Sequence, residues 1–328
     1  MPSLPRIRRS RARGGSPVLA PAPVVHELTA SGLTWVNVVS PDVETAQGLA
    51  ARFGWHPLDV EDIVSKRQRP KVDDYEDDGY LFAVLHFPFY DTQVQRLNAA
   101  ELDIFVGPDY LITLPETHLP PLSAMFDRLR NREDLREQTF SKGSGYLLYR
   151  IVDANVDAAF PMLRKMGNKL DRLEDDIFEG RSSEIVRDIS NAKQEIINFR
   201  KIVRPQRAVL RDLERTKQRY LAEELEIYFD DISDAAERIW DTLENYKEVV
   251  EALESTNEAV LSHRLNDSFR ILTAASVVLL PLTLIASIFG MNVDFPGENA
   301  QWTFFAILGL MALTLVILTI YFRRRGWL

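Results

Sequence analysis

A few small polar side chains interrupt an otherwise apolar stretch near the C-terminal end of the chain. Within residues 271–289 these side chains are Thr273, Ser276, Thr283 and Ser287. At about 100° per residue of helix they fall inside a wedge of roughly 80°. Such a stripe of hydroxyl groups can line a water-filled path, or it can let two membrane helices pack closely. Residue types and spacing leave both interpretations open.

The stripe continues beyond the apolar stretch on the same helical phase. The candidate pore-lining set is Asn266, Phe269, Leu272, Thr273, Ser276, Leu280, Thr283 and Ser287. Phe269 and Leu280 are bulky interruptions of this stripe. Hydrophobic constrictions of this kind can gate a pore by dewetting. The pattern is therefore compatible with a conduit that has narrow apolar points.

Composition excludes several kinds of chemistry. The 328 residues contain no cysteine, which rules out disulfide scaffolds, Cys-ligated zinc and thiol nucleophiles. The five histidines are scattered and show no metal-binding spacing on one helix face. A net charge of -9 disfavours nucleic acid as a partner. We expect neither an enzyme nor a bound cofactor.

Two apolar segments predict membrane helices. Residues 271–289 and 304–322 contain no charge and approach the ~20 residues that cross a bilayer. Arg264 and Arg270 precede the first segment, and the basic end 323–328 follows the second. Because the connecting loop carries only acidic charges, the positive-inside bias predicts that both termini are cytoplasmic. We expect a multi-pass protein of the cell (inner) membrane.

The first part of the chain has mixed α and β signals. Residues 1–25 are basic and rich in proline, and we interpret them as a disordered tail. Residues 26–140 alternate short strand and helix signals, including a strand at 33–39 and a hairpin between 101 and 114. The acidic run 73–78 is either a cation site or a solvated loop. The fold class predicted here is an α+β cytoplasmic domain.

Residues 141–270 have helical periodicity and predict a stalk. We expect Pro205 to interrupt this pattern. A seven-residue apolar repeat follows from Leu225 to Val260, with a second register from Phe229 to Asn257. Such a seam requires partner helices. If residues 223–289 form one helix, it is roughly 100 Å long.

The motif Gly290-Met291-Asn292 follows the first predicted span directly. It begins the loop of residues 290–303, which we expect outside the membrane. A short motif in this position resembles the signature of a known family. Further matching motifs are His56-Pro57-Leu58 with Glu61-Asp62, residues 68–71, Tyr146 to Tyr149 through Asp153, Pro281-Leu282-Thr283 and Trp327-Leu328. From about His26 onward, the chain resembles the CorA family of magnesium transporters.

The resemblance implies a funnel-shaped homopentamer whose first span lines the pore. It assigns the selectivity filter to Gly290, Met291 and Asn292, where five amide carbonyls would bind hydrated Mg²⁺ through its waters. Mg²⁺ would then be substrate and regulatory ligand, and it would flow inward down its electrochemical gradient. Divalent cations, membrane lipids and copies of the same chain are the implied partners.

The resemblance also implies an acidic regulatory site between protomers. The matching positions are Glu61, Asp62, Asp153 and Asp231. Facing carboxylates repel one another, so bound Mg²⁺ would favour a closed arrangement. Taken without the resemblance, each of these acids is better explained as an ordinary surface residue.

Three features depart from the family pattern. Phe289 replaces a frequent tyrosine, Phe269 stands where methionine is common, and the sequence after Asn292 is atypical. Cobalt and nickel remain candidate ions. A zinc or other transition-metal transporter on the same scaffold is the alternative function, although Met291 argues against it. A membrane-anchored coiled-coil scaffold that conducts nothing is the third.

Overall fold

The computed structural model describes residues 23–65, 68–91, 96–179, 182–216, 226–291 and 301–327. The predicted basic tail and Asn292 lie outside these residues, except for the last positions of the tail. The chain forms two compact units. The first contains the residues up to Arg164 together with Ile197–Leu243, and the second contains Lys165–Ile196 and Glu244–Leu328. The first unit therefore continues past the boundary expected at residue 140.

A six-stranded sheet forms the centre of the first unit, in the order β1-β2-β6-β5-β4-β3. β2 and β6 are parallel, and all other neighbours are antiparallel. The pairing of β5 with β6 confirms the predicted hairpin. The strands are β1 Val25–Ala30, β2 Leu33–Val38, β3 Lys71–Tyr75, β4 Tyr80–Asp91, β5 Arg96–Val106 and β6 Tyr110–Pro115.

The acidic run 73–78 was expected to be a cation site or a solvated loop, and its first half is a strand and not a loop. Asp73, Asp74 and Tyr75 belong to the edge strand β3, which pairs with β4. The following turn leads directly into β4. The loop interpretation is therefore wrong for these three residues. Although their side chains are mostly polar, their backbone groups pair with β4 instead of with water.

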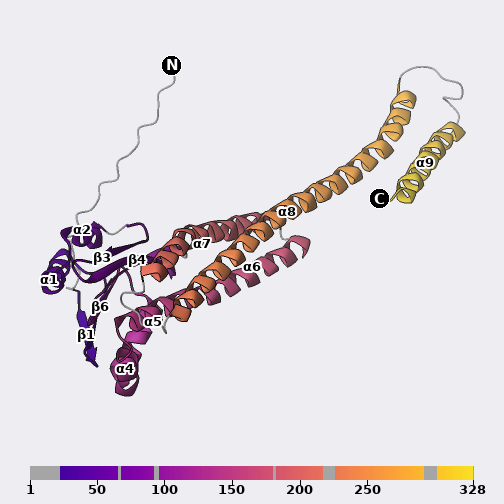
Figure 1. Ribbon diagram of the computed structural model, residues 1–328. Helices are drawn as coiled ribbons and strands as arrows, with labels where there is room; N and C mark the ends of the chain where they lie inside the picture. Colours follow the sequence, from indigo (N-terminus) through magenta and orange to yellow (C-terminus); the bar gives the residue numbers. More distant parts are fainter. Residues whose placement is uncertain are drawn as a thin grey trace, which may run out of the picture. The chain divides into compact units, whose positions relative to one another are not determined.

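Two helices, α1 (Val43–Phe53) and α2 (Pro57–Ser65), cover one face of the sheet (Figure 1). The Asp42 side chain accepts a hydrogen bond from the Thr45 backbone N–H and caps α1. Gly54 ends the helix in the left-handed conformation at φ 72°, as the sequence predicts. Apolar side chains of both helices pack against alternate residues of β2, β4, β5 and β6.

Three helices lie on the other face: α3 (Pro120–Asn131), α4 (Glu133–Phe140) and α5 (Ser144–Asp157). Phe126 of α3 meets the ring of the fully buried Trp35 edge-on, with centroids 4.8 Å apart. α5 contacts both β5 and β6. Since the sheet is covered on both sides, α5 belongs with the α/β layers.

Three long helices follow: α6 (Ala159–Glu179), α7 (Ser182–Thr216) and α8 (Glu226–Phe289). The prediction that Pro205 interrupts the helical pattern is wrong, because α7 continues through it. Pro205 and Lys201, whose carbonyl loses its helical partner, are both exposed. Water can therefore satisfy that carbonyl, and neighbouring packing keeps the helix intact.

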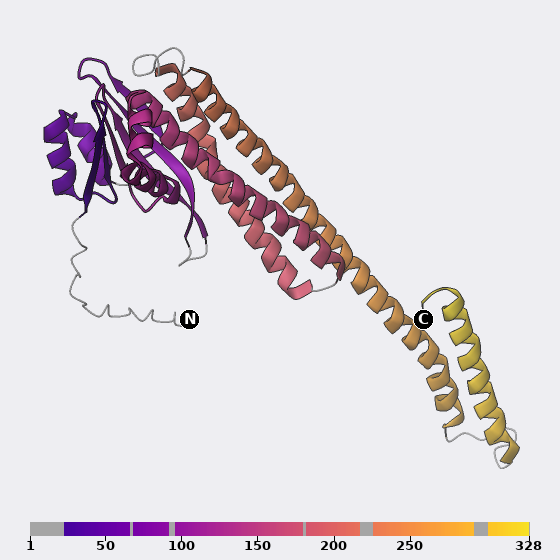
Figure 2. The same ribbon diagram turned by 90° about the horizontal axis from the view of Figure 1, so that it is seen from below.

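The predicted seam of α8 finds its partners within the same chain. In each unit a segment of α8 packs beside segments of α6 and α7 (Figure 2). In the first unit, Glu237 of α8 forms ion pairs with Arg207 and Arg211 of α7. In the second, the Tyr246 hydroxyl fills the space beside Gly167 of α6. The buried seam residues are Phe229, Ile232, Ala236, Ile239, Leu243, Val250, Leu253 and Asn257.

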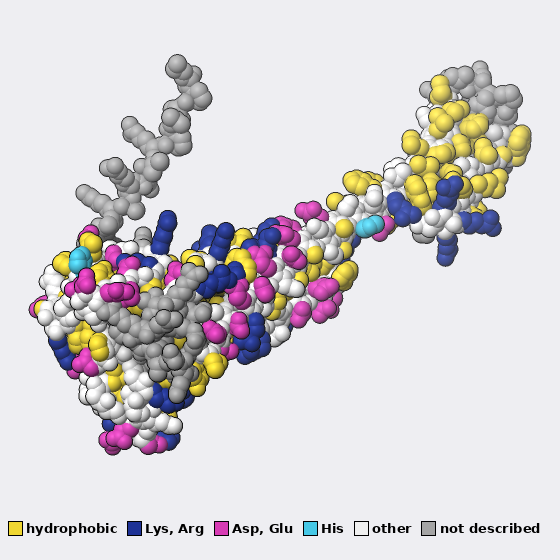
Figure 3. Space-filling view, in the orientation of Figure 1, with side chains coloured by type: hydrophobic (Ala, Val, Ile, Leu, Met, Phe, Trp, Pro, Cys, Tyr) yellow, Lys and Arg dark blue, Asp and Glu magenta, His cyan; other side chains and the backbone are white. Residues whose placement is uncertain are grey.

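Two described helices are long and apolar enough to cross a membrane: α8, within Ile227–Phe289, and α9 (Gln301–Arg324). α8 is one helix of 64 residues, so the stalk continues into the first span without a break. Apolar side chains cover the surface of both spans in Figure 3, with arginines next to them. This arrangement confirms the predicted pair of C-terminal spans.

Candidate functional site

The polar stripe of the first span faces away from the second span. Ala274 and Val278 of α8 are buried against Phe322 of α9. Ser276 and Thr283 are exposed. At about 100° per residue, these two hydroxyls lie roughly opposite the buried pair. Close packing between the two spans of one chain therefore does not explain the stripe.

The other members of the predicted pore-lining set share this exposed face. Phe269 and Leu280 are 62% and 67% exposed, although both are large and apolar. The exposed members are Asn266, Phe269, Leu272, Thr273, Ser276, Leu280, Thr283 and Ser287. In the single chain this face is open, so lipid, water or a second copy of the chain can cover it.

Two hydroxyl groups of the stripe donate to carbonyls of their own helix. Ser276 donates to the Leu272 carbonyl at 2.9 Å, and Thr283 donates to the Leu279 carbonyl at 2.9 Å. A hydroxyl oxygen that donates once still has lone pairs that can accept. Ser276 and Thr283 therefore offer outward-facing acceptors while their own donors are satisfied.

The outer end of α8 needs a glycine. The Gly290 backbone N–H donates to the Ala286 carbonyl at 2.9 Å. A Cβ at position 290 would lie 2.9 Å from that same oxygen, closer than real Cβ atoms approach. Met291 follows and is 59% exposed, while Asn292 lies outside the described residues. Only the first two residues of the predicted filter are therefore placed.

The opposite end of the two spans is basic. The Arg270 guanidinium at the start of the first span lies 5.6 Å from the ring centroid of Trp327. It also donates to the Gly326 carbonyl at 3.3 Å. These contacts bring the end of the chain next to the start of the first span. The arginines that flank both spans therefore lie at one end of the helical pair.

Two of the predicted regulatory acids lie near each other on different helices. Asp153 is on α5 and Asp231 is near the start of α8. The rings of Tyr149 on α5 and Tyr228 on α8 contact each other at a tilt, with centroids 4.9 Å apart. Burial raises the pKa of Asp153, and the charges of Asp157 and Asp231 raise it further, while the nearby Arg150 guanidinium lowers it. Asp153 therefore lies among both acidic and basic neighbours.

The other two predicted acids lie on α2. Asp62 forms an ion pair with Lys71 of β3 at 2.7 Å, and Glu61 is exposed. No three histidines or acids of the described part of the chain converge into a group able to hold a metal ion. One protomer therefore does not bring Glu61 and Asp62 together with Asp153 and Asp231. Their carboxylate oxygens nevertheless fit Mg²⁺, which prefers hard oxygen ligands.

Sequence analysis missed two buried acids. Asp59 accepts hydrogen bonds from the hydroxyls of Tyr75 and Tyr80 at 2.8 and 2.6 Å, and burial raises its pKa. Asp103 is 4% exposed, and burial together with the Glu101 charge raises its pKa well above the usual range. The sequence did contain a signal for Asp103, because this aspartate stands inside the apolar run that forms β5.

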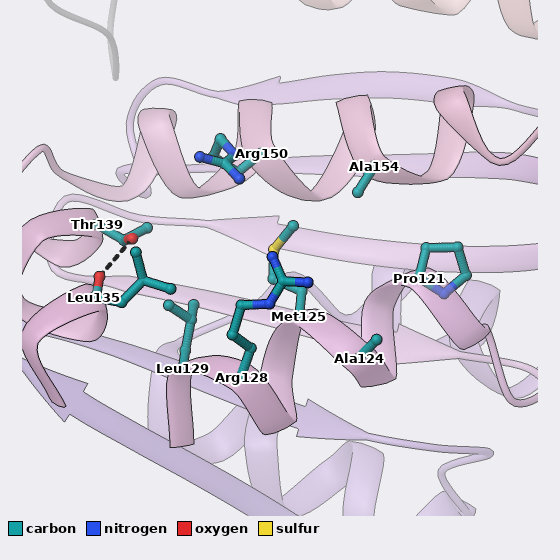
Figure 4. A pocket seen from close by; sticks show the side chains of 9 residues that line it. All are labelled: Pro121, Ala124, Met125, Arg128, Leu129, Leu135, Thr139, Arg150 and Ala154. Carbon is teal, nitrogen blue, oxygen red and sulfur yellow. Dashed lines mark hydrogen bonds between the residues drawn. The ribbon is translucent and has the colours of Figure 1, made fainter. Parts of the chain in front are cut away.

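A pocket of about 260 Å³ lies between α3, α4 and α5 (Figure 4). Its wall is mostly apolar, with the guanidinium groups of Arg128 and Arg150 at its edge. The lining residues are Pro121, Ala124, Met125, Arg128, Leu129, Leu135, Thr139, Arg150 and Ala154. None of the predicted site residues lines this pocket, which has no carboxylate to offer a cation.

An α/β domain, a helix that continues into a two-span pair, and a polar face on the first span together define a membrane transport protein. Residues 30–324 match the family model described as "CorA-like Mg2+ transporter protein". The chain belongs to this family.

Individual relatives agree with that assignment. The chain is 31% identical over 298 residues to the "Cobalt/magnesium transport protein CorA" of Thermotoga maritima, covering 90% of this chain and 83% of the relative. The solved structure of the CorA magnesium transporter from Methanocaldococcus jannaschii matches with a TM-score of 0.78 at 22% identity, over 90% of this chain and 92% of that one. The ZntB cytoplasmic domain from Vibrio parahaemolyticus matches with a TM-score of 0.56 at 13% identity, over 72% and 90% of the two chains. The two structural matches show a shared fold.

Proposed function

We propose that this chain is one protomer of a homopentameric channel that carries Mg²⁺ into the cytoplasm. The observation that supports this most directly is the polar face of α8, which lies opposite the side that packs on α9. Five such faces around an axis would enclose a path lined by hydroxyl oxygens. Family membership supports a divalent cation as the permeating ion.

The direction of flow follows from membrane energetics. A potential of 100 mV, negative inside, is worth about 2.3 kcal/mol for each elementary charge, and therefore about twice that for a divalent cation. Inward flux needs no nucleotide. With the basic flanks of the spans on the cytoplasmic side, both termini are cytoplasmic and the loop after Gly290 faces outward.

Asn292 is proposed to form the outer filter with Gly290 and Met291. A ring of neutral amide oxygens would bind the hydrated ion through its water molecules. Carboxylates in the same place would hold the ion for longer and slow its passage. Phe269 and Leu280 are the proposed hydrophobic constrictions, since both project from the exposed face of α8.

The experiment that tests this function is uptake into proteoliposomes that contain the purified chain. With an inside-negative potential, Mg²⁺ should enter, and Co²⁺ or Ni²⁺ should compete if they share the filter. The name of the Thermotoga relative supports cobalt as a second ion. Preferred Zn²⁺ uptake would favour the alternative of a zinc transporter, and no uptake of any cation would favour the non-conducting scaffold.

We propose further that cytoplasmic Mg²⁺ closes the channel at an inter-protomer site made by Glu61, Asp62, Asp153 and Asp231. The positions of Asp153 and Asp231 near each other on α5 and α8 support this site, although Arg150 and Lys71 place positive charges beside Asp153 and Asp62. Bound Mg²⁺ would offset the repulsion between facing carboxylates and favour the closed arrangement.

Protease protection of the soluble domain, measured with uptake over the same Mg²⁺ titration, tests this regulation. The wild type should become more protected and less active as Mg²⁺ rises. Asp62→Asn and Asp231→Asn should each move both midpoints to higher Mg²⁺ without loss of assembly. If both variants keep the wild-type midpoints, the sensor lies elsewhere.

A further inference from the structure

Lys71 holds the Asp62 carboxylate from within the same chain. Its ammonium nitrogen lies 2.7 Å from Asp62 Oδ2 and 2.5 Å from Asp73 Oδ2. The same nitrogen lies 5.1 Å from the ring centroid of Phe82. Lys71 is on β3, Asp62 is in the last turn of α2, and Asp73 is two residues further along β3.

The surroundings of Lys71 favour the charged ion pair. Its ammonium contacts two carboxylates at once, those of Asp62 and Asp73. The Lys71 side chain is 32% exposed and that of Asp62 is 21% exposed, so the pair is partly shielded from water. Because Lys71 is attached to the neighbouring strand β3, the local concentration of its ammonium near the Asp62 carboxylate does not depend on the Mg²⁺ concentration.

We infer that Lys71 is a tethered competitor that sets the Mg²⁺ concentration at which the regulatory site fills. This inference depends on the proposed regulatory role of Asp62. An Mg²⁺ ion with its water shell and a lysine ammonium both seek the same carboxylate oxygens. For Mg²⁺ to engage Asp62, the Lys71 ammonium must move away from it.

The size of the effect follows from how often Asp62 is free. If a site is able to bind its ligand for only a fraction of the time, its apparent affinity for that ligand is reduced by the same fraction. If Asp62 is free for about 10–30% of the time, Lys71 raises the Mg²⁺ midpoint about three- to tenfold.

A change at Asp73 should shift the Mg²⁺ midpoint in the opposite direction to a change at Lys71. Because Asp73 shares the ammonium with Asp62, it draws Lys71 partly away from Asp62. Removing the Asp73 charge should strengthen competition at Asp62 and raise the Mg²⁺ midpoint. Asp77, in the turn that follows β3, is exposed and provides a matched loss of charge without contact to Lys71.

The experiment uses the full chain in lipid nanodiscs and reads protease protection of the soluble domain during an Mg²⁺ titration. Lys71→Gln should lower the midpoint about three- to tenfold. Lys71→Arg keeps the positive charge and should remain close to wild type. Asp73→Asn should raise the midpoint more than Asp77→Asn does. Thermal unfolding of each variant establishes that the domain remains folded.

A double variant separates direct competition from general electrostatics. In an Asp62→Asn background, Lys71→Gln should have no further effect, because the contested carboxylate is gone. If the Lys71→Gln shift persists in that background, or if Lys71→Gln alone leaves the midpoint unchanged, the inference is overturned while the regulatory role of Asp62 stands. If Asp62→Asn alone titrates as wild type, the proposed regulation fails and this inference fails with it.

Discussion

Ala274 and Ser276 lie two positions apart on α8 and face opposite sides of it. Ala274 is fully buried in the contact with α9, whereas Ser276 is exposed. Two residues correspond to a rotation of about 200° around a helix. The first span therefore has one face that holds the second span and another that remains available, and each face gives a different prediction.

Enlarging the buried face should destabilise the two-span unit. Ala274→Leu adds three carbon atoms where no space is open, and overpacking costs about 1–3 kcal/mol. Ser276→Ala removes only a hydroxyl that bonds to its own helix, so its stability should stay within about 0.5 kcal/mol of wild type. Thermal unfolding in detergent measures both. Equal losses in the two variants would contradict the assignment of faces.

Shortening the side chain at the proposed constriction should make the channel leak. Phe269→Ala removes a bulky apolar group from the exposed stripe and with it a barrier to hydration. Mg²⁺ uptake should then persist at high internal Mg²⁺, where the proposed regulation would close the wild type. Ile271→Ala is the matched control, since Ile271 is also exposed but lies off the stripe. If Phe269→Ala only lowers stability, with unchanged conduction for each pentamer, the residue serves packing.

Removing the filter amide should abolish transport without disturbing the fold. Asn292→Ala deletes the proposed ring of carbonyl acceptors, and a side chain in a polar loop contributes little to stability. Uptake into proteoliposomes should fall to background, while size-exclusion chromatography reports an intact oligomer. Asn299→Ala, a matched loss of an amide in the same connecting loop, should transport normally. Wild-type uptake by Asn292→Ala would end the filter assignment.

The buried Asp103 should make stability depend on pH. Its pKa in the folded chain is well above the ordinary value of 3.8, because burial disfavours the charged form. The folded state therefore keeps this proton at a pH where the unfolded state has lost it, and stability should fall as the pH rises above that ordinary value. Asp103→Asn cannot titrate, so its thermal midpoint should decline less steeply. Parallel pH profiles for the two proteins would contradict a raised pKa.

Local patterns along the chain determined which elements form. The two apolar segments had the length and lack of charge that a bilayer requires, and Gly54 had the conformational freedom needed to end α1. The seven-residue repeat after Leu225 predicted a helix with a buried seam. These features depend on neighbours within a few residues, which is why the sequence alone could reveal them.

Only the tertiary structure decided what each element meets. It placed α6 and α7 of the same chain against the seam of α8, and it carried α7 through Pro205. It turned the hydroxyl stripe away from α9, buried Asp103 inside the sheet domain, and set Lys71 against Asp62. Periodicity identifies a face of a helix but not its partner, because the partner is chosen by packing between residues far apart in the chain.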